Sequence, residues 1–283
     1  MYKNSFLIEA IIYLVILNLV MPLQASEINK TFLKKESVQL KSILGSCEVI
    51  KSNDDKIHIT LKYSFKDEEF QANYSESGEN LSMEEKFLVK DPKGTSFWTI
   101  ALPDNIKMNF SSGTGNISIE GVKSEIKVET GTGFITIKNG EGIFNSSTGT
   151  GSIEVNKSTG KFELASGMGS LNISDIKIDG ISKFSSGMGG VNILLSSSPK
   201  YDISASSGFG EVIVNYNGNP LIGCFEFTAK QDQGRISSPV KFEKEESYSD
   251  DHFQYDKKSF CIDGQNTPKI KIDTGSGMAK LLK

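Results

Sequence analysis

A hydroxyl residue followed by Gly-x-Gly recurs seven times in this sequence and is its strongest candidate for chemistry. Glycine loops bind phosphate when they join a strand to the start of a helix, because the backbone N–H groups then point at the anion. Here the motif is followed by alternating apolar and polar residues, which are typical of a strand. We therefore interpret the motif as a structural corner. Its paired glycines are Gly113 and Gly115, Gly131 and Gly133, Gly149 and Gly151, Gly167 and Gly169, Gly187 and Gly189, Gly208 and Gly210, and Gly275 and Gly277.

The other polar residues do not form a catalytic or metal-binding pattern. Calcium-binding β-rolls need an aspartate at a fixed place in each repeat, whereas the residues after the second glycine include Asn116, Phe134 and Ser152. Glycoside cleavage needs two carboxylates that face one cleft, and the glutamates of the repeats are scattered. His58 and His252 are far apart in the sequence, and nothing supports a Ser-His-Asp arrangement around either. We predict no catalytic residue, no metal site, no cofactor and no enzymatic activity.

The spacing of the motif indicates a repeat protein. Successive first glycines are 18, 18, 18, 20, 21 and then 67 residues apart. Apolar residues stand four and six places after the first glycine, as in Ile117 and Ile119, and usually five and three places before it, with Ser146 and Ser182 as exceptions. This period of two predicts a strand on each side of a glycine corner. One rung cannot fold alone, so we predict an all-β solenoid with rungs of 18–21 residues, stabilised by stacked neighbours.

Five segments follow from these patterns. Residues 1–25 have the lysine, apolar stretch and short exit of a secretory signal peptide. Residues 26–102 have looser spacing and are expected to form an N-terminal β cap. Residues 103–216 form the repeat solenoid, an insertion occupies residues 217–269, and residues 270–283 supply the final rung. We expect the mature chain to be exported to the periplasm, the cell surface or the medium, without a membrane span.

Three cysteines are too few for a scaffold built from disulfides, and none has the C-x-x-C spacing of a zinc or redox site. Cys224 and Cys261 both lie in the insertion, and an exported protein can oxidise them to a disulfide. From the sequence, a disulfide and two reduced thiols are equally compatible with these positions. If the pair forms, Cys47 is left as a buried free thiol.

The residue between the two glycines changes from threonine to a large apolar residue in three successive rungs. These residues are Met168, Met188 and Phe209. If the side chains point outward, they form an apolar interaction stripe along one corner. If they point inward, they fill a wider core in the longer rungs, and this second interpretation is the one that we favour from the sequence.

The segment LPDNIKMNFSSGTGNISIEGVKSEIKVETGTGFITIKNGEG resembles the bacterial putative-adhesin domain of unknown function, a family also described as the toastrack repeat. The shared features are the leader, a Leu-Pro turn just before the repeats, and successive Ser/Thr-Gly-x-Gly-x-Ile/Val rungs. The resemblance covers the chain from residue 38 to the C-terminus, and the insertion matches least well. It implies a solenoid-like envelope protein, and it transfers no catalytic or binding residue to this chain.

Composition narrows the choice of partner. The net charge is −4 and Arg235 is the sole arginine, so no basic patch is available to neutralise the phosphates of a nucleic acid. We expect a non-catalytic, adhesin-like binding or scaffolding protein of the cell envelope, whose insertion contacts a protein or glycan partner. The alternatives are a polysaccharide-active β-helix enzyme and a structural protein that self-associates through an uncovered last strand at residues 278–283.

Overall fold

The computed structural model describes residues 25–262 and 267–283 of the chain. The signal peptide predicted for residues 1–25 lies, apart from Ala25, outside the described residues, and so do residues 263–266 of the predicted insertion. Within the described ranges, no helix is long and apolar enough to cross a membrane.

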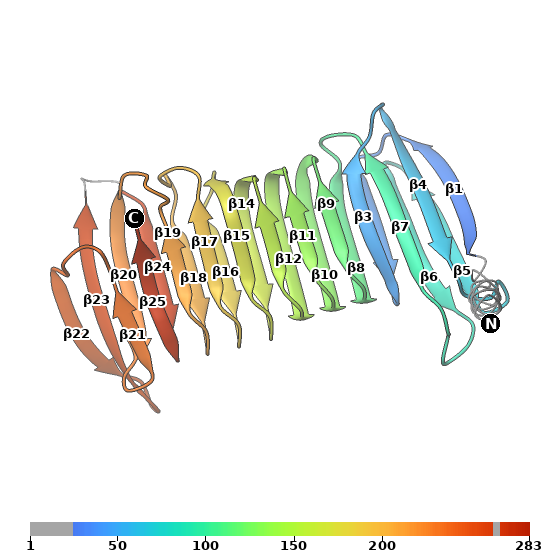
Figure 1. Ribbon diagram of the computed structural model, residues 1–283. Coiled ribbons are helices and arrows are strands. Elements are labelled where there is room, and N and C mark those ends of the chain that lie inside the picture. Colours follow the sequence, from blue (N-terminus) through green and yellow to red (C-terminus); the bar gives the residue numbers. More distant parts are fainter. Residues whose placement is uncertain (1–24, 263–266) are drawn as a thin grey trace, which may run out of the picture.

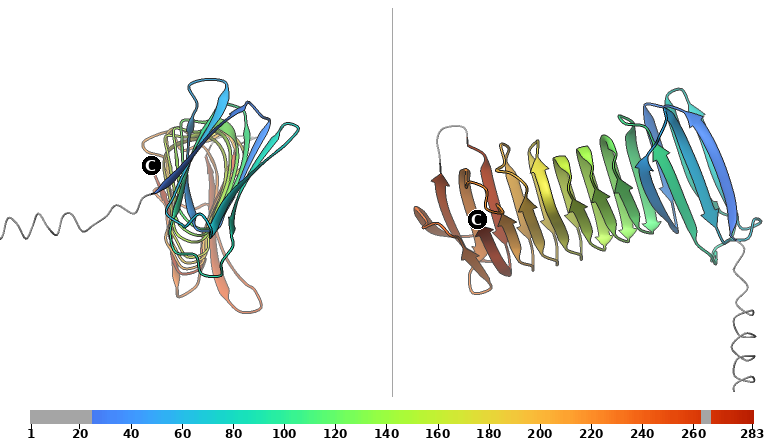
Figure 2. Two further views of the ribbon diagram at one scale, coloured as in Figure 1. Left: turned by 90° about the vertical axis from the view of Figure 1, so that its right-hand side faces the viewer. Right: turned by 45° about the horizontal axis from the view of Figure 1, so that its top comes forward.

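Two long sheets, here called sheet A and sheet B, face each other across one core and form the elongated body in Figures 1 and 2. In the centre of the body each rung gives one strand to each sheet. Sheet B contains β8 (Lys107–Thr114), β10 (Lys123–Thr132), β12 (Glu141–Thr150), β14 (Thr159–Ser166), β16 (Ser182–Ser186) and β18 (Ile203–Ser207). Sheet A contains β9 (Ile117–Glu120), β11 (Ile135–Lys138), β13 (Ile153–Asn156), β15 (Leu171–Ile178), β17 (Val191–Leu195) and β19 (Val212–Asn215). The last two residues of β15, Lys177 and Ile178, pair with β14 in sheet B. The prediction of an all-β, solenoid-like repeat fold is confirmed.

Equivalent residues of successive rungs pair in parallel, so the apolar side chains stack in columns. Ile135 lies beside Ile117 in sheet A, for example, and both are buried. In sheet B the rings of Phe144, Phe162 and Phe184 stack with centroids 5.2 and 6.2 Å apart. Every rung therefore buries its inward side chains against the rungs before and after it, as a repeat that cannot fold alone must do.

The glycines of the corner motif are required by close backbone contact between rungs. A Cβ atom on Gly131 would lie 2.6 Å from the carbonyl oxygen of Gly113, and a Cβ on Gly149 would lie 2.7 Å from that of Gly131. Real Cβ atoms do not approach a carbonyl oxygen so closely. Because the obstruction is backbone, it cannot be relieved by moving a side chain, which explains why the motif recurs in every central rung.

The N-terminal region, residues 26–102, contains complete solenoid rungs as well as capping strands. Its strands are β1 (Ser26–Leu33), β2 (Ser37–Ser42), β3 (Gly45–Lys51), β4 (Lys56–Tyr63), β5 (Phe70–Ser77), β6 (Asn80–Phe87) and β7 (Ser96–Leu102). Strands β2 and β3 pair in parallel with β8 and β9, and β6 and β7 pair in parallel with β2 and β3 on their other side. Antiparallel strands then end the body, with β5 beside β6 in sheet B and β4 and β1 beyond β7 in sheet A (Figure 1).

The C-terminal rung is not at the end of the body. Its strands β24 (Lys269–Thr274) and β25 (Gly277–Leu282) lie between β18 and β19 on one side and the insertion strands β20 (Gly223–Lys230) and β21 (Gly234–Ser237) on the other (Figure 1). The antiparallel hairpin of β23 (Gln254–Ile262) and β22 (Lys244–Ser249) extends sheet B further. The expectation that residues 278–283 form an uncovered last strand is therefore wrong, because the insertion folds back as an additional outer rung.

Met168, Met188 and Phe209 point into solvent, with 57, 60 and 70 % of each residue exposed. The expectation that they pack into the core is wrong. The hydroxyl residue two places earlier is buried in each rung, and the residue between the glycines therefore lies on the outside of the corner. The three side chains form an exposed apolar row along the later rungs.

Candidate functional site

A groove of 750 Å³ lies on the outer face of sheet B, over the four strands at the C-terminal end of the body. Strands β24, β20, β23 and β22 follow one another across this part of the sheet. The lining residues are Glu226, Thr228, Glu246, Ser247, Tyr248, Asp250, Tyr255, Lys257 and Asp273. A groove that combines polar and aromatic side chains is a candidate site for ligand binding.

Strand periodicity brings the groove residues of β20 to the outer face. Phe225 and Phe227 point into the core and are buried, so the residues that alternate with them, Glu226 and Thr228, face outward. In register, Thr228 lies directly beside Asp273 of β24 on one side and Lys257 of β23 on the other. Strand β20 therefore contributes to two surfaces. Its inward phenylalanines pack in the core, and its outward residues form the floor of the groove.

Two lysines hold the carboxylate of Glu226. Lys257 Nζ is 3.0 Å from Glu226 Oε2, and Lys271 Nζ is 3.7 Å from Glu226 Oε1. The hydrogen bond to Glu226 raises the pKa of Lys257 above its ordinary value. Both partners of the shorter pair are only about one-third exposed, so this ion pair is screened less than a fully solvated one. Glu226 is accordingly held in the floor of the groove by two ion pairs.

Asp273 is in the opposite environment. Burial raises the pKa of the Asp273 carboxyl, and a hydrogen bond with Thr228 works in the other direction. The negative charge of Glu226 raises the pKa further, whereas Lys271 and Lys257 lower it. Asp273 is therefore a carboxyl group with a raised pKa that lies close to the ion-paired Glu226.

The hairpin turn supplies the outer wall of the groove. Oδ1 of Asp250 accepts hydrogen bonds from the backbone N–H groups of His252 and Phe253, at 2.9 and 2.7 Å, and these bonds lower the pKa of Asp250. The rings of Tyr248 and Tyr255 stack behind the turn with centroids 5.3 Å apart and planes 17° apart. Tyr248 is 46 % exposed, so part of its ring is free for contact with a ligand.

The hairpin is attached to the solenoid by covalent and polar contacts. Cys224 of β20 and Cys261 of β23 lie opposite each other in register and form a disulfide. At the other end of the strand pair, Gln231 Nε2 donates to Asp256 Oδ1 at 2.7 Å and to Ser247 Oγ at 3.2 Å. The remaining cysteine, Cys47, is a buried free thiol, and burial raises its pKa.

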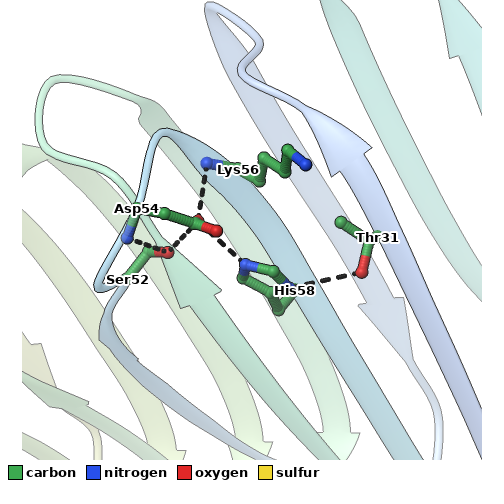
Figure 3. Close-up of polar contacts among 5 residues, drawn as sticks. All are labelled: Thr31, Ser52, Asp54, Lys56 and His58. Atoms are coloured by element: carbon green, nitrogen blue, oxygen red, sulfur yellow. Dashed lines mark hydrogen bonds and ion pairs between the residues drawn. The ribbon is translucent and has the colours of Figure 1, made fainter.

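A second polar cluster surrounds His58 on the opposite end of the body (Figure 3). His58 Nε2 is 2.8 Å from Asp54 Oδ1, and His58 Nδ1 is 3.2 Å from Thr31 Oγ1. The same carboxylate oxygen accepts hydrogen bonds from Ser52 Oγ at 3.0 Å and from the backbone N–H of Lys56 at 2.9 Å. The hydrogen bond with His58 is the largest cause of a lowered pKa at Asp54.

This cluster resembles a hydroxyl–imidazole–carboxylate relay, yet its contacts have a structural explanation. Ser52 donates to Asp54, so its hydroxyl is held by the carboxylate and not by the imidazole. Asp54 organises the turn between β3 and β4 through the bonds from Ser52 and Lys56. His58 then connects this turn to Thr31 on the edge strand β1. We assign the cluster to the attachment of β1.

The structure also places the residues of the corner motif. The hydroxyls of the motif are buried and donate to glycine carbonyls of the neighbouring rung, as Ser166 Oγ does to Gly151 O at 2.8 Å. Within residues 25–262 and 267–283, no group of three or more His, Cys, Asp or Glu side chains is arranged to hold a metal ion. The apolar row of Met168, Met188 and Phe209 is exposed on the corner and contributes no residue to the groove.

Sequence reasoning placed a specific contact in the insertion but did not identify most residues of the groove. Two aspartates of the insertion have different roles. Asp250 lines the groove, whereas Asp256 hydrogen bonds with Gln231 and Ser247. Glu226 was identifiable from the alternation in CFEFTAK, which separates its outward residues from the inward phenylalanines. Asp273 was not, because its place beside β20 depends on the return path of the chain.

Comparisons with known proteins add little to this description. No family model and no curated protein matches the chain. A solved structure, the crystal structure of a putative cell adhesion protein from Clostridium sporogenes, aligns over 91 % of this chain and 99 % of its own, with 15 % sequence identity and a TM-score of 0.31. Membership of the toastrack family stays a prediction from the sequence motif, and the site is defined by the geometry of this chain.

Proposed function

We propose that this chain is an exported, non-catalytic binding protein of the cell envelope, with an adhesin-like or scaffolding role, and that its groove on β24, β20, β23 and β22 contacts the partner. The observation that carries the proposal is the groove itself, which the insertion builds on the end of a rigid stack of rungs. Irregular segments on a repeat scaffold are the usual place for specific contacts.

The way in which the groove is held supports a binding role. A binding surface gains affinity when its groups are ordered before the ligand arrives. The floor strand β20 lies between β24 and β23 in one continuous sheet, and the Cys224–Cys261 disulfide fixes the outer hairpin to it. A disulfide is also compatible with an exported protein, since such bonds persist in oxidising compartments.

A pull-down from envelope extract tests this proposal. Deletion of the whole insertion is unsuitable as a test, because loss of β20 would uncover β24 and would remove the buried Phe225 and Phe227 from the core. The bait is therefore the purified chain beside a variant with Tyr248→Ala and Glu246→Gln, two substitutions on the exposed strand β22. A partner that the parent retains and the variant loses supports the proposal.

A matched control separates a site effect from a general change of surface. Tyr201→Ala combined with Glu163→Gln makes the same chemical changes at exposed positions outside the groove. The control variant is expected to capture the partner as the parent does. Equal capture by all three proteins would move the contact away from the groove, and capture by none would contradict a binding role in the envelope.

One observation favours a second candidate, a polysaccharide-active enzyme. Glu226 forms ion pairs with two lysines, and burial raises the pKa of Asp273 on the adjacent strand. A carboxyl group with a raised pKa next to a second, ion-paired carboxylate is a pattern found in sites with a general acid beside a base or nucleophile. Release of reducing ends from a polysaccharide by the parent, abolished by Asp273→Asn and by Glu226→Gln, would replace the binding proposal with this one.

The third possibility from the sequence, a self-assembling structural protein, needs an edge other than residues 278–283, because β21 pairs with β25. Strand β22 has β23 on one side in the described chain, and its six residues are all exposed. Its charged residues, Lys244, Glu245 and Glu246, are of the kind that oppose edge-to-edge association. Monomeric behaviour in sedimentation equilibrium would agree with the binding proposal and contradict self-assembly.

A further inference from the structure

We infer that the groove binds a glycan that carries protonated amino groups, with the Tyr248–Tyr255 pair as the stacking surface for a sugar ring and the carboxylates of Asp250 and Asp273 as partners of the amines. This inference rests on the proposed binding function and deepens it by naming the class of ligand. It is independent of the family resemblance and follows from the shape, the aromatic surface and the charge distribution of the groove.

The shape of the groove suits an extended ligand that carries many polar groups. The groove runs over four adjacent strands, a width of about 14 Å at the usual spacing between strands. It occupies 750 Å³ and is lined by hydroxyl, carboxyl, amino and phenolic groups. Among its lining residues only the two tyrosines have large apolar surfaces. An apolar ligand or an apolar helix would leave the remaining groups without hydrogen-bond partners.

The stacked tyrosine pair provides an aromatic face in this polar setting. Ring centroids 5.3 Å apart and an interplanar angle of 17° keep Tyr248 parallel to Tyr255, and the hairpin register sets them opposite each other. Tyr255 is further placed by its phenol, which hydrogen bonds with Asp250 and has a raised pKa, mainly because of burial. An exposed aromatic ring that is rigid before binding loses little entropy when a ligand stacks on it.

The charges of the groove favour a glycan with amino groups over an acidic glycan. Glu226 is paired with Lys257 and Lys271, and no free carboxylate remains there for a ligand cation. Asp250 and Asp273, in contrast, form none of the ion pairs found among the described residues. Ammonium groups of a ligand would give both carboxylates charge-assisted hydrogen bonds. An acidic glycan would instead face like charges.

The two carboxylates are also held in position. The backbone of the β22–β23 turn holds Asp250 through the N–H groups of His252 and Phe253. Thr228 hydrogen bonds with Asp273 from the neighbouring strand. Asp250 therefore marks the hairpin side of the groove and Asp273 marks the solenoid side, with the floor strand β20 and strand β23 between them. A ligand that reaches both must extend across the groove, as an oligosaccharide with several amino groups does.

Isothermal titration of the purified protein with defined oligomers tests the inference. The probes are a glucosamine hexamer, its fully N-acetylated counterpart, an oligogalacturonate and a lysine hexapeptide, all at a pH at which the amines are protonated. The glucosamine hexamer is expected to bind at least tenfold more tightly than the N-acetylated hexamer, and the oligogalacturonate is expected not to bind. Tighter binding of the lysine peptide would identify a cationic polypeptide as the ligand and overturn the inference.

Point variants connect the binding to named groups. Asp250→Asn or Asp273→Asn is expected to weaken binding of the glucosamine hexamer at least tenfold and to leave the N-acetylated hexamer nearly unchanged, because only the ammonium contact is removed. Tyr248→Ala is expected to weaken both at least fivefold. Asp179→Asn and Tyr201→Ala, exposed residues outside the groove, serve as matched controls with parent affinity.

The outcomes separate this inference from the proposed function. If no glycan binds, and an envelope partner is still captured by the parent and lost by the Tyr248→Ala, Glu246→Gln variant, the ligand class is wrong and the binding function stands. If neither glycan nor partner depends on the groove, both are wrong. Equal affinity for the amino and the N-acetylated hexamers overturns the role of the carboxylates.

Discussion

Ser112 donates its buried hydroxyl hydrogen to the carbonyl oxygen of Gly45 in the neighbouring rung, over 3.0 Å. The same relationship recurs along the body, between the hydroxyl of each corner motif and the second glycine of the rung next to it. The pairs are Thr130 and Gly115, Thr148 and Gly133, Ser166 and Gly151, Ser186 and Gly169, Ser207 and Gly189, and Thr274 and Gly210. The two parts of the motif therefore act together. The glycines allow the backbones of neighbouring rungs to lie close to each other, and the hydroxyl then donates a hydrogen bond across the rungs.

Removing one hydroxyl from this ladder should destabilise the solenoid. Thr148→Val keeps the shape of the side chain but leaves the carbonyl of Gly133 without its 3.0 Å donor. We expect a loss of about 1–2 kcal/mol in the free energy of unfolding, the usual cost of an unsatisfied buried group. Thr132→Val changes an exposed threonine that precedes Gly133 in the neighbouring rung and is the control. Urea denaturation of both variants checks this, and equal stabilities would contradict the structural role of the hydroxyl.

Substitution of Ser146 should increase the stability of the protein. Its buried Oγ has no hydrogen-bond partner, and its neighbours in the column are Val128 and Leu164. Ser146→Val should stabilise the protein by about 1–2 kcal/mol, because an unsatisfied hydroxyl is replaced by an apolar group of similar size. Ser182→Val should do the reverse, since Ser182 Oγ donates to Gly180 O and accepts from Phe162 N. Chemical denaturation that ranks the two variants in the opposite order would contradict this account.

The central rungs could be predicted from the sequence because their determinants are local. Alternation fixes which side chains face inward, and the corner glycines recur wherever a backbone carbonyl of the preceding rung lies against them. The first rung escaped detection because Ile43 stands at the place of the first glycine. At that place the neighbouring rung presents the carboxylate of Glu85, which accepts from the N–H groups of Ile43 and Leu44. Without a carbonyl against it, the corner tolerates a side chain.

The two ends and the groove could not be predicted, because they depend on the order in which strands join the sheets. Strand β20 leaves the repeat before β24 forms and still lies outside it. Glu226 and Asp273 become neighbours only through this return path. The outward direction of Met168 was misjudged for a related reason. Periodicity shows that corner residues alternate, but the burial of the preceding hydroxyl is what decides which residues face inward.

Asp273 should give the stability of the protein a distinct dependence on pH. Burial raises its pKa in the folded state above the ordinary value of 3.8, so the folded chain holds the proton more tightly than the unfolded chain. Its contribution to stability is therefore complete below the unfolded pKa and is lost as pH rises through the folded pKa. Asp273→Asn should remove this loss and be more stable than the parent at neutral pH. Denaturation midpoints measured from pH 3 to pH 7 check the trend.

Asp250→Asn is the control for that experiment, because the pKa of Asp250 is shifted in the opposite direction to that of Asp273. Hydrogen bonds from the backbone N–H groups of His252 and Phe253 lower the pKa of Asp250. Its ionised form is therefore favoured by folding, and its contribution is present above the unfolded pKa and lost as pH falls through the folded pKa. The two variants should shift the pH profile in opposite directions. Parallel shifts would show that the carboxyl environments described for the groove are wrong.

The disulfide should determine how firmly the groove is assembled. In the chain-entropy picture, the bond between Cys224 and Cys261, 37 residues apart, contributes about 2–4 kcal/mol. Replacing both cysteines with serine should accelerate amide hydrogen exchange in β22 and β23 and leave the central rungs unchanged, because solenoid ends open separately. Reductant added to the parent should have the same effect. Unchanged exchange in β22 and β23 would mean that the polar contacts of Gln231 suffice to hold the hairpin.

Glu85 closes the hydroxyl ladder at its N-terminal end. It lies beside Ser42 in the ladder position, is buried, and accepts hydrogen bonds from Ser42 Oγ, Ser96 Oγ and Trp98 Nε1, the last at 2.8 Å. The backbone N–H groups of Ile43 and Leu44 add two further donors to the same carboxylate. Only a carboxylate, which has acceptors and no donor, can satisfy all five.

Glu85→Gln should therefore destabilise the N-terminal rungs, because its amide N–H₂ group would face a donor. We expect a loss of about 3 kcal/mol, since hydrogen bonds to a charged group contribute about 1.5–3 kcal/mol each. Glu84→Gln, on the exposed face of the same strand, is the matched control. Trp98 is the sole tryptophan, so its fluorescence reports this region directly. An unchanged unfolding midpoint of Trp98 fluorescence in Glu85→Gln would show that the carboxylate does not hold the first rungs together.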